Sequence, residues 1–163
     1  MKRAHYPIVA TLILAGTATL AGAAEPAAEQ TMIDRGRYIA RIAGCNDCHT
    51  PNYATTGGEV PEQQWLTGDR LGWRGPWGTT YPSNLRLALS RLSEDEWVRN
   101  ARTLSYRPPM PWFALRDMDE TDLRAFYRFV RVLGPAGEPA PAYLPPGAQP
   151  QGMAIVFPAA GPH

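Results

Sequence analysis

Both cysteines of this 163-residue chain fall in the stretch CNDCH, which also holds one of its three histidines. Thiol chemistry is therefore confined to Cys45 and Cys48, with His49 beside them. Three kinds of site use cysteines at this spacing: a redox disulfide, a zinc site and an attachment point for haem. Each kind of site requires different secondary structure and different further ligands around the motif. The identity of this site therefore constrains the fold more than any other feature.

The sequence lacks elements that a redox disulfide and a zinc site would each require. A thioredoxin-like pair follows a strand and opens a helix within a βαβ pattern, whereas these cysteines follow a helical pattern. A closed zinc site needs one more ligand than the motif supplies. His5 lies in the predicted export signal and His163 at the far end of the chain, so zinc would require a carboxylate or a contact from the tail.

Covalent haem attachment uses every part of the motif. Cys45 and Cys48 lie on one face of a helical turn, so both thiols can form thioethers with the haem vinyl groups, and His49 can then bind the iron. The remaining interpretation is a chance occurrence of the motif in a secreted protein. The pattern favours one covalently bound haem c, with Cys45 and Cys48 as attachment sites and His49 as an iron ligand.

Residues 1–23 are predicted to be a signal peptide. They combine basic Lys2 and Arg3, an uncharged apolar run and small residues at Ala21 and Ala23. We expect cleavage after Ala23 and a periplasmic protein without a membrane span; an uncleaved anchor is the alternative. Cleavage removes two of the 16 basic residues, so the formal charge falls from +1 to −1, and nucleic-acid binding is not expected.

Three helices are predicted. The first covers residues 32–43, after a short polar leader at residues 24–31, and has its apolar residues near helical spacing. The second begins with a capping box in which Ser93 is the N-cap, and it ends near Leu104. The third is capped by Asp119 and ends at Gly134. The expected apolar positions are Ile33, Tyr38, Ile39 and Ile42 on the first helix, Trp97, Ala101 and Leu104 on the second, and Leu123, Phe126, Val130 and Leu133 on the third.

In two segments the apolar residues follow neither helical nor strand spacing over any length. Residues 51–92 are rich in Gly, Pro, Thr and Trp and are predicted to form a long loop that wraps a bound apolar group. Residues 135–163 contain a proline every few positions, which predicts an extended or disordered tail. Tyr143, Leu144 and the run 155–157 could fasten parts of that tail to the domain.

Met110 is the candidate for the sixth iron ligand. It lies in the stiff segment PPMPW, where the prolines prevent helix formation and hold its thioether between two helices. A methionine filling a gap in the core is the alternative interpretation. A second histidine ligand would require His163 to fold back from the tail.

The stretches RGRYIARIAGCNDCHT, GPWGTTYPSNL, LSEDEWVRNAR and RPPMPWFALRDMDETDLRAFYRFVRVLG together resemble class I c-type cytochromes, which are small monohaem proteins. More narrowly, they are similar to the single-haem modules in the cytochrome subunits of periplasmic alcohol, aldehyde and gluconate dehydrogenases. The chain departs from those subunits by having one haem motif where they commonly have three, and by lacking a C-terminal anchoring helix.

The resemblance implies an all-α cytochrome c fold of three to four helices at residues 32–134. It also implies that the first and last helices cross at Gly36, against Phe126 or Tyr127. It places Trp77, Tyr81 and Asn84 near the edge of the haem and its propionates.

The expected function is electron transfer through His/Met-ligated iron, without catalysis of its own. The protein would act as a free carrier or as a dehydrogenase subunit, with a periplasmic dehydrogenase or a terminal oxidase as partner. The alternative is a haem enzyme or small-ligand binder whose sixth iron position is open, as in peroxidases.

Overall fold

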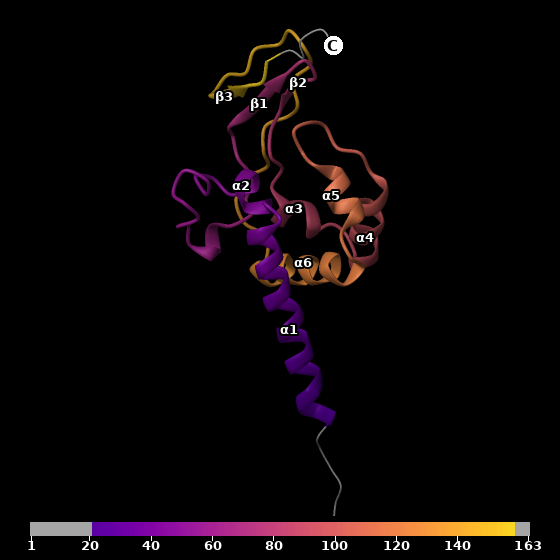
Figure 1. The fold of residues 1–163 in the computed structure, drawn as a ribbon. Coiled ribbons are helices and arrows are strands. Elements are labelled where there is room, and N and C mark those ends of the chain that lie inside the picture. Colours follow the sequence, from indigo (N-terminus) through magenta and orange to yellow (C-terminus); the bar gives the residue numbers. More distant parts are fainter. Residues whose placement is uncertain (1–20, 159–163) are drawn as a thin grey trace, which may run out of the picture.

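The computed structural model describes residues 21–158, which are mostly helical (Figure 1). The predicted signal peptide lies largely outside the described residues. In chain order, the elements are α1 (Ala21–Ile42), α2 (Cys45–His49), the 3₁₀ turn η1 (Glu62–Gln64), β1 (Gly72–Gly75), β2 (Gly78–Thr80), α3 (Leu85–Leu89), α4 (Glu94–Thr103), α5 (Trp112–Asp117), α6 (Glu120–Leu133) and β3 (Ala154–Val156).

Helix α1 is longer than predicted. It begins at Ala21 and includes the whole leader assigned to residues 24–31, with Pro26 inside it. Figure 1 shows this first part of α1 extending away from the rest of the molecule. The buried face of α1 comes from Ile33, Ile39 and Ala40. Of the other apolar positions expected on that face, Tyr38 and Ile42 are 49% and 59% exposed.

Helices α1 and α6 cross at Gly36, as the resemblance to cytochromes c implied, but the contact residues differ. A Cβ atom placed on Gly36 would lie 2.0 Å from the carbonyl oxygen of Ala125 and 2.7 Å from Cβ of Phe129. These two residues, rather than the expected Phe126 and Tyr127, lie against the glycine. Only a residue without a side chain permits this approach of the two backbones.

The two later helices begin as predicted. The hydroxyl of Ser93 accepts a hydrogen bond from the Glu96 amide, and the Glu96 carboxylate accepts one from the Ser93 amide, so the capping box of α4 is formed. Asp119 occupies the N-cap position of α6, although its side chain makes no capping hydrogen bond. Gly134 ends α6 with a positive φ of 70°.

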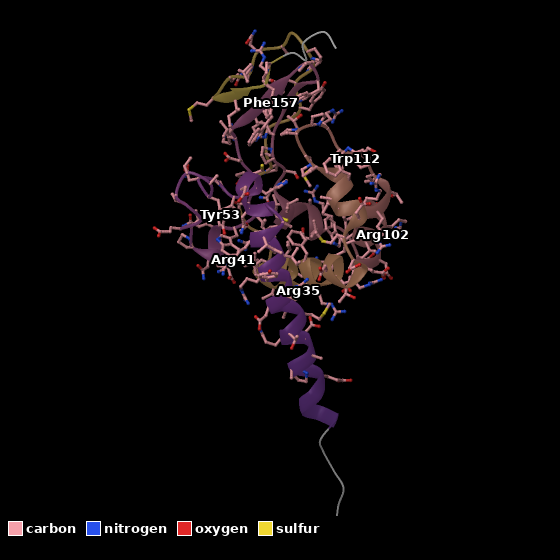
Figure 2. The ribbon with its side chains drawn as sticks, in the orientation of Figure 1. Arg35, Arg41, Tyr53, Arg102, Trp112 and Phe157 are labelled. Carbon is pink, nitrogen blue, oxygen red and sulfur yellow. The ribbon has the colours of Figure 1, made fainter. Side chains whose placement is uncertain are left out.

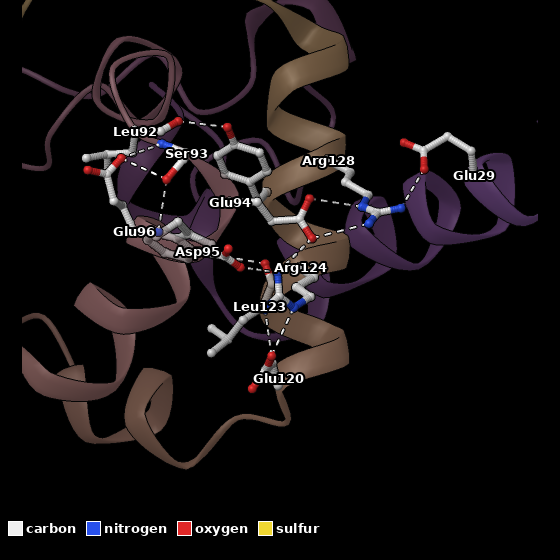
Figure 3. Close-up of polar contacts among 12 residues, drawn as sticks. Glu29, Leu92, Ser93, Glu94, Asp95, Glu96, Glu120, Leu123, Arg124 and Arg128 are labelled. Atoms are coloured by element: carbon white, nitrogen blue, oxygen red, sulfur yellow. Dashed lines mark hydrogen bonds and ion pairs between the residues drawn. The ribbon is translucent and has the colours of Figure 1, made fainter.

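The apolar stripe of α6 includes the predicted Leu123, Phe126 and Val130 together with Phe129, all at most 3% exposed. Trp97 of α4 lies against Phe126, with ring centroids 5.7 Å apart, and its indole nitrogen donates to the Leu123 carbonyl. On the outer face, arginines of α6 form ion pairs with α1 and α4 (Figure 3). Arg124 pairs with Glu94, Asp95 and Glu120, and Arg128 pairs with Glu29 and Glu94.

The expectation of an all-α fold missed a small sheet with strand order β2-β1-β3. Strands β1 and β2 form an antiparallel hairpin within the predicted loop, with Gly75 opposite Gly78. The tail then adds β3 parallel to β1, pairing Trp73 with Ile155. The described part of the tail is thus fastened to the domain by β3 and by the Thr79–Leu144 bridge.

Aromatic rings hold the tail strand against this sheet. Phe157 lies at the sheet end of the molecule (Figure 2). The centroid of its ring is 5.9 Å from that of Trp73 and 5.4 Å from that of Trp77. Two short helices, α3 and α5, also lie in segments where the sequence predicted none. Within residues 21–158, no helix combines the length and apolar character that a membrane span requires.

Candidate haem site

An apolar cavity of about 420 Å³ gathers the chemistry-bearing residues of the sequence. The CNDCH motif forms one wall, and the proline-rich segment at residues 104–111, here named the strap, forms another. Side chains of α3, α4 and α6 lie deeper, and the hairpin and the tail border the remaining side. Cys45, Cys48, His49 and Met110 all line this cavity.

The motif is held as one turn of helix by a buried hydrogen-bond network. Gly44, with a φ of 71°, turns the chain from α1 into α2. The Thr50 hydroxyl donates to the side-chain oxygen of Asn46 at 2.8 Å and accepts from the Leu66 amide at 2.7 Å. Asn46 and Thr50 are at most 1% exposed. Sequence reasoning missed both residues, although a polar residue inside the motif followed by a threonine is the signal that could have pointed to them.

His49 has a neutral imidazole at the cavity wall. Its Nδ1 lies 2.7 Å from the backbone oxygen of Ser83. Because a carbonyl can only accept, Nδ1 must carry the proton, and Nε2 keeps its lone pair free for a metal. Burial lowers the pKa of His49, an effect only partly opposed by the hydrogen bond to Ser83. The imidazole is therefore uncharged at neutral pH.

The two thiols are free and lie in an apolar setting. Burial, with a smaller contribution from the charge of Asp47, raises the pKa of the Cys45 thiol to about 12. Burial also raises the pKa of Cys48. A redox-active cysteine needs the opposite environment, which stabilises the thiolate. This setting favours the attachment interpretation over the redox pair.

The strap brings Met110 to the cavity from the other direction. The Met110 amide donates to the Arg107 carbonyl at 3.2 Å, and the Trp112 amide donates to the Met110 carbonyl at 2.9 Å, so the backbone turns tightly on both sides of the methionine. Met110 is partly buried against the core. Met118, whose neighbours in the sequence are charged, also lines the cavity.

The three residues assigned by resemblance occupy different places. Tyr81 lines the cavity, whereas Trp77 and Asn84 do not. Trp77 lies in the turn between β1 and β2, and its carbonyl accepts from the Tyr143 hydroxyl of the tail at 2.8 Å. Asn84 caps α3 by accepting from the Leu87 amide, and its amide nitrogen donates to the backbone of the tail at Ala136 and Glu138.

These residues fit a haem better than a bare metal ion. Among residues 21–158, no group of three His, Cys, Asp or Glu side chains is arranged to hold a metal ion. The cavity instead offers an apolar lining, two thiols one helical turn apart, a neutral imidazole and a thioether. Imidazole and thioether are the ligands of haem iron in cytochromes c.

Comparison with curated proteins finds distant relatives of two kinds. The cytochrome c subunits of quinone alcohol dehydrogenases from Gluconacetobacter polyoxogenes and Komagataeibacter europaeus are each 27% identical to this chain over 146 residues, which cover 82% of this chain and 28% of theirs. A nicotinate dehydrogenase subunit from Pseudomonas putida is 26% identical over 123 residues, covering 68% of this chain and 9% of that protein. No family model and no solved structure matches.

The chain therefore spans little more than a quarter of the alcohol dehydrogenase subunits that it resembles, and less of the nicotinate dehydrogenase subunit. At this level, the similarity loosely supports a cytochrome-like or dehydrogenase-associated role.

Proposed function

We propose that this chain is an exported monohaem c-type cytochrome that transfers electrons. The observation that carries the proposal is the convergence of Cys45, Cys48, His49 and Met110 on one apolar cavity. The two cysteines would hold the haem through thioethers, and His49 and Met110 would bind its iron. When bound, the haem supplies an iron that accepts and releases single electrons.

Electron transfer is favoured when the groups that bind the iron keep the same positions in both oxidation states. Contacts around His49 and Met110 hold these two residues in place. The hydrogen bond from His49 to Ser83 fixes the orientation of the imidazole. The turns on both sides of Met110 limit the movement of its thioether. Neutral ligands in an apolar cavity favour the ferrous form, which carries the smaller charge, and so favour a high reduction potential.

The relatives named as cytochrome c subunits support a dehydrogenase as the electron donor. The protein would then receive electrons as a subunit or as a free carrier and pass them to a terminal oxidase or another acceptor. Expression with its signal peptide, followed by affinity purification from the periplasm, separates the two arrangements. A dehydrogenase that remains bound at physiological ionic strength indicates a subunit.

Covalent haem in the exported protein tests the proposal. We expect haem to stay with the wild-type chain through denaturing electrophoresis, and the bound haem to be reduced and reoxidised reversibly. Cys45→Ala and Cys48→Ala should each keep at most one thioether bond, and the double variant should lose covalent haem. A wild-type protein that matures in the periplasm without haem would refute the proposal.

A further inference from the structure

Among the described residues, Arg107 is the one Arg, Lys, Asp or Glu side chain in the cavity lining. It belongs to the strap, three residues before Met110. Within residues 21–158, no carboxylate lies within 4.0 Å of its guanidinium. A permanent positive charge thus borders an apolar cavity without an acidic partner from the described chain.

The tail holds this guanidinium in place. Cζ of Arg107 lies 4.0 Å from the centroid of the Tyr143 ring, which is a close cation–π contact. The Tyr143 hydroxyl donates to the Trp77 carbonyl at 2.8 Å. The next residue, Leu144, exchanges backbone hydrogen bonds with Thr79 at 2.8 and 3.0 Å. The ring below Arg107 is therefore fixed to the hairpin at two points.

The same end of the cavity contains a polar atom without a partner. The Thr80 hydroxyl is buried and makes no hydrogen bond, and Thr80 lines the cavity next to the Thr79–Leu144 bridge. A buried hydroxyl without a partner is unusual in a folded protein. The hairpin, the tail and Arg107 thus form a polar end of the cavity, whereas the lining residues Leu89, Trp97, Leu115 and Phe126 are apolar and buried.

We propose that Tyr143 is a positioning residue of the C-terminal tail that holds Arg107 over the cavity, where the guanidinium pairs with a propionate carboxylate of the haem. This inference rests on the proposed function. A haem carries two propionates, and an apolar cavity offers them no compensation, so the polar end is where they can be accommodated. A guanidinium suits a carboxylate because its planar donors can bind both oxygens. The tail is thereby part of the cofactor site.

The reduction potential of the haem-loaded protein tests this assignment. A positive charge near the haem favours the ferrous state, so Arg107→Gln should lower the potential, and Arg107→Lys should restore part of the shift. Arg99→Gln is the matched control, because Arg99 is exposed on α4 and does not line the cavity. It should leave the potential close to the wild-type value.

Variants of Tyr143 test whether this residue acts by positioning the Arg107 guanidinium or only by filling space. Tyr143→Leu should lower the potential in the wild-type background and cause no further shift in the Arg107→Gln background, because its effect passes through the guanidinium. Tyr143→Phe keeps the ring and should stay near the wild-type value. Equal shifts from Tyr143→Leu in both backgrounds would overturn the positioning role.

Two results distinguish this inference from the proposed function. A haem-loaded wild type whose potential is unchanged in Arg107→Gln overturns the inference alone. A wild type that matures without haem overturns both.

Discussion

The half of the molecule built from α1, α4 and α6 and the half that surrounds the cavity are held together in different ways. In the helical half, backbones meet closely at Gly36, and arginines of α6 are paired with carboxylates of α1 and α4 (Figure 3). In the other half, loops, the strap, the hairpin and the tail enclose an apolar cavity, to which α3, α4, α5 and α6 also contribute side chains.

The two halves also differ in their buried polar side-chain atoms that have no hydrogen-bond partner. Within residues 21–158 these are Asn46 Nδ2, Trp77 Nε1, Thr79 Oγ1 and Thr80 Oγ1, and all belong to the motif or to the hairpin segment. None belongs to α1, α4 or α6. Local conflicts of this kind concentrate at functional sites in natural proteins. Within the described residues, the helical half therefore satisfies its buried side-chain polar atoms by itself, whereas the cavity half does not, and of these four residues Thr80 lines the cavity.

Gly36→Val should have the largest effect on stability. The new side chain would meet the backbone of α6 at Ala125, which cannot move aside without separating the two helices. We expect the free energy of unfolding to fall by about 3 kcal/mol, as measured by urea denaturation. Gly152→Ala is the control, because a Cβ there meets no atom within 4 Å. Equal stability of the two variants would show that the crossing is not tight.

Arg86→Met should be the next most damaging change. Arg86 is 6% exposed and donates to the carbonyls of Leu133 and Gly134 at the end of α6 and, at 2.7 Å, to that of Gln63. Its loss leaves buried carbonyls without donors, which should cost about 2 kcal/mol. The exposed control Arg99→Met should shift the urea midpoint little. A midpoint for Arg86→Met that matches the control would contradict the buried role of Arg86.

Met110→Leu should lower the stability of the haem-free protein less than Arg86→Met does. Leucine has a similar volume, and the methionine is only partly buried at the cavity wall. The free energy of unfolding of the haem-free form should change by less than about 1.5 kcal/mol. A larger loss would mean that the strap supports the fold by itself and would weaken the distinction between the two halves.

Glu94→Gln should have the smallest effect. Glu94 bridges Arg124 and Arg128 on the surface of the helical half, and partly exposed ion pairs contribute little. We expect a loss of about 0.5 kcal/mol at low ionic strength that disappears in 1 M salt. A loss that persists at high salt would indicate packing rather than charge as its cause.

Local patterns in the sequence predicted much of the helical half, although Leu104, expected on the apolar face of α4, is 45% exposed. The capping box at Ser93, the stop at Gly134 and the buried stripe of α6 each depend on neighbours a few residues apart. The start of α1 was misjudged, because the alanine-rich leader continues the helix back to Ala21. The glycine at the crossing was predicted, but its contacts depend on the rotation of α6, which no local pattern fixes.

The cavity half was less predictable, because it depends on contacts between distant segments. The strands β1 and β2 are short and rich in glycine, and the pairing of β1 with β3 joins residues about 80 positions apart. Helix α5 is a six-residue segment following a proline. The motif and Met110 could be proposed as site residues from their chemistry alone. The buried hydrogen bonds of Arg86 and the contact of Arg107 with Tyr143 join distant segments, so no local pattern predicts them.

The iron ligands test the central claim most directly. The ferric wild-type protein should be low-spin and show the weak absorption band at the red end of the spectrum that iron–thioether ligation produces. Met110→Ala should abolish that band and lower the reduction potential, whereas Met118→Leu, at the second methionine of the cavity lining, should retain it. A high-spin wild type that binds cyanide readily, or a band that survives in Met110→Ala and disappears in Met118→Leu, would contradict the assignment of His49 and Met110 as the ligand pair.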